Sequence, residues 1–248
     1  MNERQLQLLD MLHQSESELS TLHLSEALGV SEVTVRKDIK LLESHGLLQR
    51  SHGSVRPASP DSIAARMGIR YEIKRRIADR AAQLVGHGET LMIESGSSCV
   101  LFAQALMQQQ KDVTIITNSA FLCQTLAGSA GGNLILLGGD YQADSMVMAG
   151  PLTELCAKEF HVQRMFLGID GYHEGSFSGM NYNRASACRA MAKRADQRII
   201  LSDSSKFSRR SVAHCFDASE IDLVITDDGL PLDARDSMEA CGTQLIMI

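Results

Sequence analysis

The sequence predicts an α/β protein in which a small, mostly helical N-terminal domain precedes a larger domain built on a parallel β-sheet. One observation is a pair of short amphipathic helices followed by two short strands, all within residues 24–56. The other is a pattern of apolar strands, Gly- or Ser-rich loops and helices that repeats over residues 90–248. Such alternation is typical of a parallel sheet covered by helices on both faces. A length of 248 residues accommodates both domains.

Three helices are predicted in the N-terminal domain. The first spans residues 3–14, where leucines recur at a helical spacing, and we expect it to complete a small three-helix core. A short second helix covers residues 24–28 and is closed by Gly29, and a third covers residues 31–45 with the Ser31 hydroxyl as its N-cap. Two short helices joined by a tight turn form the helix-turn-helix pattern.

The third helix separates an apolar side from a basic one. Val35, Ile39 and Leu42 recur at i, i+4 and i+7 and predict one buried face. Hydroxyl and basic side chains project from the other faces: Thr34, Arg36, Lys37 and Lys40. An exposed basic helix of this kind favours DNA binding, and the alternative is an ordinary solvated helical hairpin with scattered charges.

Two short strands within residues 47–56 predict a wing beside the third helix. They flank a turn at His52, Gly53 and Ser54. Arg50, His52 and Arg56 would lie along this wing, where basic side chains can meet DNA phosphates. The wing strengthens the DNA-binding interpretation.

The formal net charge of -6 excludes a protein that coats nucleic acid indiscriminately. Residues 1–75 contain ten basic and ten acidic side chains, so the whole negative excess lies in the C-terminal part. DNA binding would therefore depend on a local basic cluster.

The six cysteines are spread singly, without the spacing of a metal site or a disulfide framework. We expect a protein of a reducing compartment, with most of these thiols buried. The sequence has no signal peptide and no apolar run of the roughly twenty residues that a membrane span requires. It therefore predicts a cytoplasmic protein with no membrane partner.

Domain boundaries follow from composition. Residues 57–66 contain two of the four prolines and predict a linker. We therefore expect a DNA-binding domain at residues 1–56, a linker at 57–68 and an effector-binding domain at 69–248.

The larger domain is predicted to contain seven strands. They lie at 90–94, 113–116, 134–137, 165–169, 199–202, 222–226 and 244–248. Helical patterns precede or separate several of them, at 71–84, 99–109, 120–127 and 185–195. In parallel sheets of this kind, ligands bind outside the C-terminal ends of the strands.

Five loops at those predicted strand ends are rich in small, hydroxyl and amide side chains. They are Glu94-Ser95-Gly96-Ser97-Ser98, Thr117-Asn118-Ser119, Gly138-Gly139-Asp140, Asp170-Gly171 and Asp203-Ser204-Ser205-Lys206. A Gly/Ser-rich turn that opens a helix offers amide donors and hydroxyls to a phosphate. Together the loops suit a phosphorylated sugar or polyol. The alternative for each single loop is a tight turn and a helix cap, with Asp170 as a cap and Lys206 paired with a carboxylate.

The sequence contains no H-E-x-x-H, G-x-S-x-G or P-loop motif. We therefore assign no metal site, no cofactor and no catalytic residue.

Both halves of the chain resemble the DeoR-type bacterial transcriptional regulators. The N-terminal signature is VSEVTVRKDIKLLESHGLLQRSHGS, residues 30–54, and the C-terminal one combines IESGSS, TIITNS, LLGG, FLGIDG and DSSKF in the family's order. The resemblance implies a winged helix-turn-helix joined to a sensor domain similar to ribose-5-phosphate isomerase and CoA-transferase folds. It also implies a homo-oligomer, a homodimer or homotetramer, that binds a double-stranded DNA operator under control of a phosphorylated sugar or related metabolite.

Carried onto this chain, the resemblance assigns roles to two sets of residues. Those implied to face the DNA major groove are Ser31, Thr34, Arg36 and Lys37. Those implied to line the effector pocket are Glu94, Gly96, Ser97, Ser98, Asn118, Gly139, Asp170 and Lys206.

Three features of the chain depart from the family pattern. Ser54 replaces the usual second glycine of the wing, and Ser97-Ser98 replace the commoner Thr-Thr. The segment NYNRASACRAM, residues 181–191, lacks the glutamate that family members often place there, which puts the usual effector class in doubt.

Two other functions compete with the metabolite-responsive regulator. One is a sugar-phosphate isomerase fused to a DNA-binding module, but Gly171 stands where the related isomerases have an acidic residue, and such a reaction needs a positioned base. The other is a constitutive repressor with a vestigial pocket, whose DNA binding no metabolite changes.

Overall fold

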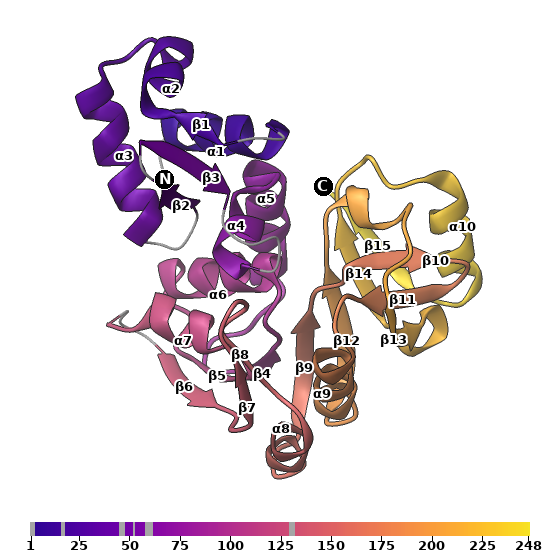
Figure 1. The fold of residues 1–248 in the computed structure, drawn as a ribbon. Helices are drawn as coiled ribbons and strands as arrows, with labels where there is room; N and C mark the ends of the chain where they lie inside the picture. Colours follow the sequence, from indigo (N-terminus) through magenta and orange to yellow (C-terminus); the bar gives the residue numbers. More distant parts are fainter. Residues whose placement is uncertain (1–2, 16–17, 45–47, 52, 58–61, 129–131) are drawn as a thin grey trace. The chain divides into compact units, whose positions relative to one another are not determined.

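A computed structural model describes residues 3–15, 18–44, 48–51, 53–57, 62–128 and 132–248 (Figure 1). The chain divides into two compact units, Met1–Tyr71 and Glu72–Ile248. Each is described by itself.

The N-terminal unit is a winged helix-turn-helix, as predicted. Its helices are α1 (Glu3–Gln14), α2 (Thr21–Leu28), α3 (Glu32–Ser44) and α4 (Ile63–Gly68). Its antiparallel sheet has the order β1–β3–β2, with β1 (Leu19–Ser20), β2 (Leu48–Ser51) and β3 (Ser54–Pro57). Leucines of α1 and α2 meet the predicted apolar face of α3 in a core whose members are at most 1% exposed: Leu8, Leu9, Leu12, Leu24, Val35, Ile39 and Leu42.

Helix α4 lies inside the segment that the sequence predicts to be a linker, residues 57–68. The Ser62 hydroxyl caps it by accepting from the Ala65 amide at 3.5 Å, and Ile63 and Ala65 are buried. The prolines of this segment precede the helix and so do not interrupt it. The N-terminal unit consequently continues to Tyr71.

The C-terminal unit is organised around one sheet of seven parallel strands, the seven that the sequence predicts. In spatial order they are β15 (Gln244–Met247), β14 (Leu223–Thr226), β12 (Ala195–Leu201), β9 (Val162–Leu167), β4 (Thr90–Ile93), β5 (Val113–Thr117) and β6 (Gly132–Leu136). The chain enters at β4, builds outward to β6, and then returns to lay β9 on the other side of β4. The order of strands therefore reverses between β4 and β9.

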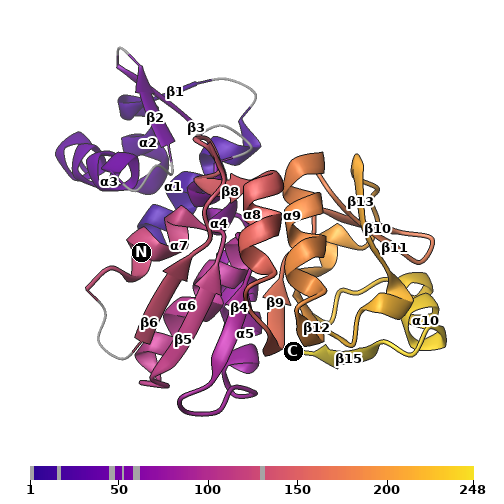
Figure 2. The same ribbon diagram turned by 90° about the horizontal axis from the view of Figure 1, so that it is seen from below.

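Helices cover both faces of this sheet. They are α5 (Tyr71–Ala82), α6 (Ser97–Gln108), α7 (Ala120–Leu126), α8 (Pro151–Ala157), α9 (Tyr182–Ala192) and α10 (Leu232–Ala240). Figure 2 shows α8 and α9 side by side on one face, with α6 on the other. Strand β9 alternates accordingly: the Phe166 ring lies 4.2 Å from the Phe102 ring of α6, whereas Met165 and Leu167 join the core that contains Met191 of α9.

Two small antiparallel sheets were not predicted from the sequence. One has the order β10–β11–β13, with β10 (Gly171–His173), β11 (Ser176–Gly179) and β13 (Ala213–Asp217), and the other pairs β7 (Asp140–Gln142) with β8 (Val147–Ala149). These strands are short, and several of their side chains are polar. A two-residue turn with positive φ at both positions, Glu174 at 47° and Gly175 at 79°, connects β10 to β11 and matches the twist of a hairpin.

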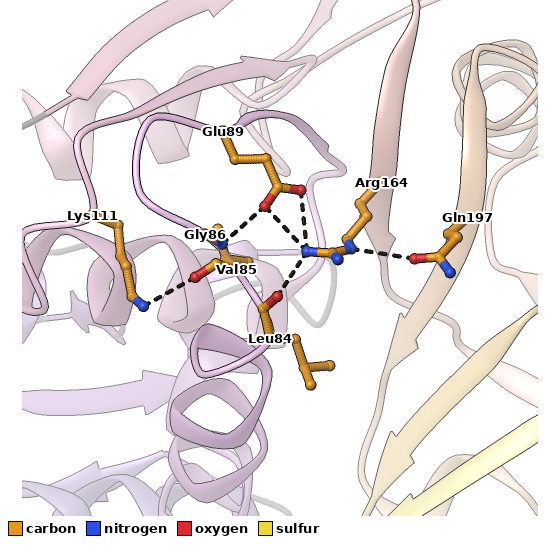
Figure 3. Close-up of polar contacts among 7 residues, drawn as sticks. All are labelled: Leu84, Val85, Gly86, Glu89, Lys111, Arg164 and Gln197. Atoms are coloured by element: carbon orange, nitrogen blue, oxygen red, sulfur yellow. Dashed lines mark hydrogen bonds and ion pairs between the residues drawn. The ribbon is translucent and has the colours of Figure 1, made fainter.

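A polar network joins the N-terminal ends of the central strands (Figure 3). Arg164 Nη1 of β9 donates to Leu84 O at 2.7 Å and to Glu89 Oε2 at 3.1 Å, and Arg164 Nε donates to Gln197 Oε1 of β12 at 3.2 Å. Glu89 also accepts from the Gly86 amide at 2.9 Å. Because the Arg164 and Glu89 side chains are only 23% and 14% exposed, this pair is less screened than a surface ion pair. It aligns β4 and β9 at the end opposite to the loops that the sequence singles out.

Candidate functional site

The start of α3 is fixed by the predicted cap. The Ser31 hydroxyl accepts from the Thr34 amide at 3.3 Å and lies 3.0 Å from the Thr34 hydroxyl. Glu32 occupies the first turn, where the helix dipole favours a negative charge. Ser31 is exposed and Thr34 is half-buried, so of the two hydroxyls that of Ser31 is the more accessible.

The basic side chains predicted to face DNA lie on the exposed side of α3. Arg36, Lys37 and Lys40 are exposed, opposite to the buried Val35 and Ile39. Arg36 Nη2 also donates to Glu32 Oε2 at 2.8 Å, one turn earlier in the helix. A phosphate or base that binds Arg36 must therefore share the guanidinium group with Glu32 or break the ion pair between them.

One buried acid attaches α3 to α1. Asp38 is 5% exposed and accepts from Arg4 Nε at 2.6 Å and from Gln5 Nε2 at 2.9 Å. Burial acts to raise the pKa of the Asp38 carboxyl, but the hydrogen bonds from Arg4 and Gln5 outweigh it, so the pKa lies below its usual value. The charged form of Asp38 thus holds the exposed face of α3 in its orientation.

The two wing arginines that the structure describes lie on opposite faces of the β2–β3 hairpin. Arg50 pairs in register with the buried Val55, and its Nη1 lies 3.7 Å from Glu43 Oε2 of α3. Arg56 pairs in register with Gln49 on the other face and donates to Gln49 Oε1 at 2.8 Å. Since side chains of a strand alternate between faces, Arg50 and Arg56 cannot both contact DNA from the same face of the hairpin.

His52, also predicted for the wing, lies outside the described residues. Its neighbour Gly53 has φ +81°, which the turn requires. Ser54, which departs from the family pattern, donates a hydrogen bond to Glu18. The serine therefore links the wing to the segment that precedes β1.

In the C-terminal unit the loops after β4 and β9 meet where the strand order reverses. A Cβ added to Gly96 would lie 3.2 Å from Gly168 Cα, so neither position leaves room for a side chain without a shift. Open parallel sheets bind ligands at such a reversal, outside the C-terminal strand ends. Gly168 belongs to the FLGIDG segment but was not assigned to the pocket from the sequence, because only the topology brings it against Gly96.

Glu94 occupies the centre of this reversal with both carboxylate oxygens engaged. Oε1 accepts from the Ser95 hydroxyl at 2.7 Å, and Oε2 accepts from the Gly96 amide at 2.8 Å and the Gly168 amide at 3.4 Å. Ser97 and Ser98 then open α6, whose N-cap, Gly96, makes no side-chain cap. The first amides of a helix have no partner within it, so this end offers donors to an anion.

Asn118, at the end of β5, is covered by the β7–β8 hairpin. Its Nδ2 donates to Met148 O at 3.1 Å, and its backbone oxygen accepts from the Met148 amide at 2.8 Å. Asn118 is fully buried, and among the described residues its Oδ1 finds no hydrogen-bond donor. Gly139 and Gly150, with φ 151° and 84°, stand at the two ends of this hairpin.

Asp170 and Lys206 lie in the loops after β9 and β12. Asp170 Oδ2 accepts from the Met180 amide at 2.9 Å, and its backbone oxygen accepts from Arg209 Nε at 2.8 Å. Lys206 ends the turn η1 (Ser204–Lys206) and is half-buried. The buried Asp227 of the next strand end orders this turn by accepting from the Ser204 amide at 2.6 Å.

Three buried thiols lie near Glu94, which the sequence did not reveal because they come from three elements: Cys99, Cys188 and Cys215. Burial is the largest cause that raises the pKa of each, and the negative charge of Glu94 adds to it; for Cys215 the pKa reaches about 12. These thiols stay protonated at neutral pH and act as small apolar groups beneath the loops.

The predicted effector residues thus lie along one rim, after β4 (Glu94, Gly96, Ser97 and Ser98), β5 (Asn118), β6 (Gly139), β9 (Asp170) and β12 (Lys206). Sequence reasoning missed Gly168, Asp227 and the hairpin that covers Asn118. Among the described residues, no group of three or more His, Cys, Asp or Glu side chains could hold a metal ion. Nor is any described helix long and apolar enough to cross a membrane.

Both units match known families. The profile described as "DeoR-like helix-turn-helix domain" matches residues 4–61, and the one described as "DeoR C terminal sensor domain" matches residues 69–228. The chain is 30% identical over 251 residues to "HTH-type transcriptional regulator GlpR" of Haloferax volcanii, which covers 98% of this chain and 96% of that protein.

Two further relatives have names that specify opposite regulatory signs. The "Glycerol-3-phosphate regulon repressor" of Escherichia coli K12 is 29% identical over 220 residues, 86% of each chain. The "L-fucose operon activator" of Haemophilus influenzae is 28% identical over 236 residues, 93% of this chain and 94% of that one. Among solved structures, ribose 5 phosphate isomerase A from Neisseria gonorrhoeae has a TM-score of 0.42 at 19% identity, over 56% of this chain and 54% of that one, a similarity too low to bear on activity.

Proposed function

The chain belongs to the DeoR family of transcriptional regulators. We propose that it is a repressor that binds a specific DNA operator, and that a phosphorylated sugar or polyol changes its affinity for that operator. One observation carries the DNA-binding part. The exposed side of α3 is lined by Arg36, Lys37 and Lys40, directly opposite the face that packs into the core. A helix presented in this way can enter the major groove while its buried side stays packed.

Replacement of Arg36 tests the DNA-binding part. We expect Arg36→Ala to weaken specific operator binding by about 1–3 kcal/mol, because a base or phosphate contact is lost. The matched control is Arg235→Ala on α10, since Arg235 also forms a helical ion pair across four residues, with Glu239 at 3.2 Å. Equal affinities of the Arg36 variant and the wild type, measured by fluorescence anisotropy, would show that α3 is oriented differently on DNA.

The effector part of the proposal rests on the donors and acceptors at the rim. The uncapped N-terminus of α6 and the amine of Lys206 would bind a phosphate, because both carry positive charge. The acceptors Glu94, Asp170 and Asn118 Oδ1 would take sugar hydroxyls. Asn118 Oδ1 supports this most directly, because it is buried and finds no donor among the described residues, and such an acceptor is costly until a donor reaches it.

A thermal-shift screen of sugar phosphates and sugar-alcohol phosphates tests the effector part. A ligand that binds only the folded protein stabilises it by about 2.7 kcal/mol at one hundred times its Kd. We expect a hit whose shift is lost in Lys206→Ala. The absence of a shift at millimolar concentrations would instead support a vestigial pocket and operator binding that no sugar phosphate changes.

We propose that the rim binds its ligand without turnover. Asp170 Oδ2 is held by the Met180 amide, Gly171 follows it in place of an acid, and the Glu174 side chain is 82% exposed in the β10–β11 turn. Turnover of ribose 5-phosphate that Asp170→Ala abolishes would contradict this proposal.

We also propose that the working form is at least a dimer in the cytoplasm, because one small DNA-binding unit offers little interface for a specific site. Light scattering of the purified protein, with and without operator DNA, measures its oligomeric state. A monomer on a single half-site would contradict the proposed dimer.

A further inference from the structure

An aliphatic side chain stands in the first turn of α3, on its exposed side. Val33 is 62% exposed, although helix α3 buries the neighbouring Val35 completely. When such a helix lies in the major groove, its N-terminal residues are the ones that contact base edges. Val33 therefore occupies a position from which sequence can be read.

The basic side chains of α3 surround this valine. Val33, Arg36, Lys37 and Lys40 recur at i, i+3, i+4 and i+7, and all four are exposed. At 3.6 residues per turn, Arg36 and Lys37 project about 60° and about 40° to either side of Val33. Cations on both sides of one apolar position would engage the DNA backbone or flanking bases and leave the central side chain against the base edges.

We propose that Val33 is a specificity-determining residue that contacts the 5-methyl group of a thymine in each operator half-site. This inference rests on the proposed function and names a part of its DNA recognition. A valine side chain cannot form hydrogen bonds, and the thymine methyl is the one apolar group that base pairs present in the major groove. Branching at Cβ also restricts Val33 in a helix to one preferred rotamer, so its methyl groups have a defined position.

Replacement of thymine by uracil isolates this contact, because it removes only the methyl group. The full-length protein would first select binding sites from random DNA, and each thymine of the enriched site would then be replaced by deoxyuridine in turn. We expect one replacement per half-site to weaken wild-type binding about 3- to 5-fold, the equivalent of one buried methyl group. Val33→Ala should bind the thymine site about 3- to 5-fold more weakly and lose no further affinity at that deoxyuridine.

Leu41→Ala is the matched control, since Leu41 is an aliphatic residue of the same helix that is 45% exposed, two turns further along. We expect the Leu41 variant to retain the full deoxyuridine penalty, and both variants to keep the wild-type melting temperature. A Val33 variant with an unchanged penalty at every thymine would overturn the inference while operator binding stands. If the wild-type protein enriches no site at all, the proposed function itself fails.

Discussion

The exposed side of α3 and the rim of the seven-stranded sheet present their polar groups in opposite ways. On α3 the basic side chains are exposed, and the ion pair of Arg36 with Glu32 is accessible to solvent. At the rim, Glu94 and Asn118 already hold backbone groups of neighbouring loops. The basic side of α3 is thus exposed before a DNA partner arrives, whereas a ligand hydroxyl that binds Glu94 at the rim must replace an internal hydrogen bond. Replacement of this kind changes the loops themselves, which is what a ligand-dependent regulator requires.

The largest expected effect tests whether the C-terminal unit depends on the close packing around the backbone of Gly139. A Cβ at Gly139 would lie 2.0 Å from Thr153 Oγ1 and 2.7 Å from Ala149 O, at a φ of 151°. We expect Gly139→Ala to lower the free energy of unfolding of the C-terminal unit by about 2–4 kcal/mol, measured by urea denaturation. Gly88→Ala is the control, because Gly88 has φ +75° with open space around it, and its cost should stay near about 1 kcal/mol. If the two variants lost the same free energy of unfolding, the steric clash expected at Gly139 would contribute nothing to stability.

The next effect concerns Asp38, the buried acid that attaches α3 to α1. Asp38→Asn keeps the shape of the side chain but removes the negative charge that accepts hydrogen bonds from Arg4 and Gln5. We expect it to lower the free energy of unfolding by about 1.5–3 kcal/mol. Because the folded-state pKa of Asp38 is lowered, its stabilisation is present above the unfolded-state pKa of about 4 and is lost as the pH falls through the folded-state pKa. Thermal unfolding followed between pH 6 and the acid limit should show this loss in the wild type and not in the variant. A variant with the same acid profile would mean that Asp38 is not the titrating group.

A smaller effect distinguishes a buried side chain that forms a hydrogen bond from one that has no partner among the described residues. Asn118→Ala removes the hydrogen bond to Met148 O and should raise the amide exchange rate of the β7–β8 hairpin by roughly 5-fold, equivalent to about 1 kcal/mol. Ser145→Ala is a control of opposite sign: Ser145 Oγ is buried, and no described residue bonds it, so its removal should be neutral or stabilising. If the serine variant opened the hairpin as much as the asparagine variant, the Ser145 hydroxyl would have a hydrogen-bond partner in the folded protein.

The smallest effect concerns the ion pair on α3. Glu32→Gln releases Arg36 from a contact between side chains that are 39% and 63% exposed. Exposed pairs of this spacing contribute only about 0.3–0.5 kcal/mol, so we expect operator affinity to rise by about twofold. Anisotropy titrations at two salt concentrations would measure it. Weaker binding in the variant would show that Glu32 itself contributes to the interface.

The N-terminal unit was largely predictable from sequence, because its information lies in side-chain type and spacing. The cap at Ser31, the buried triplet of α3 and the wing were each predicted from a local pattern and are present. The roles of the individual DNA-facing side chains stay predictions. The relation of Arg50 to Arg56 was less predictable, because it depends on the register in which β2 and β3 pair.

The C-terminal unit was predictable in its strands and less so in its site. Apolar runs identified all seven sheet strands, yet the contact of Gly96 with Gly168 follows only from the order of those strands. The hairpin over Asn118 was missed because β7 and β8 have three residues each, too few for a periodic pattern. The glycines and polar loops predicted where a ligand would bind, but not which of their hydrogen bonds are already used.

The position of β4 in the sheet has a consequence during synthesis of the chain. Strands β4, β5 and β6 can pair with one another as soon as they leave the ribosome, but the second neighbour of β4 is β9, which follows much later. Until then Leu91, Met92 and Ile93, all fully buried in the finished protein, form an open edge of a partial sheet, the kind of edge at which chains aggregate. Substitutions that delay pairing of β9 should therefore lower the yield of protein before they alter its affinity for any ligand.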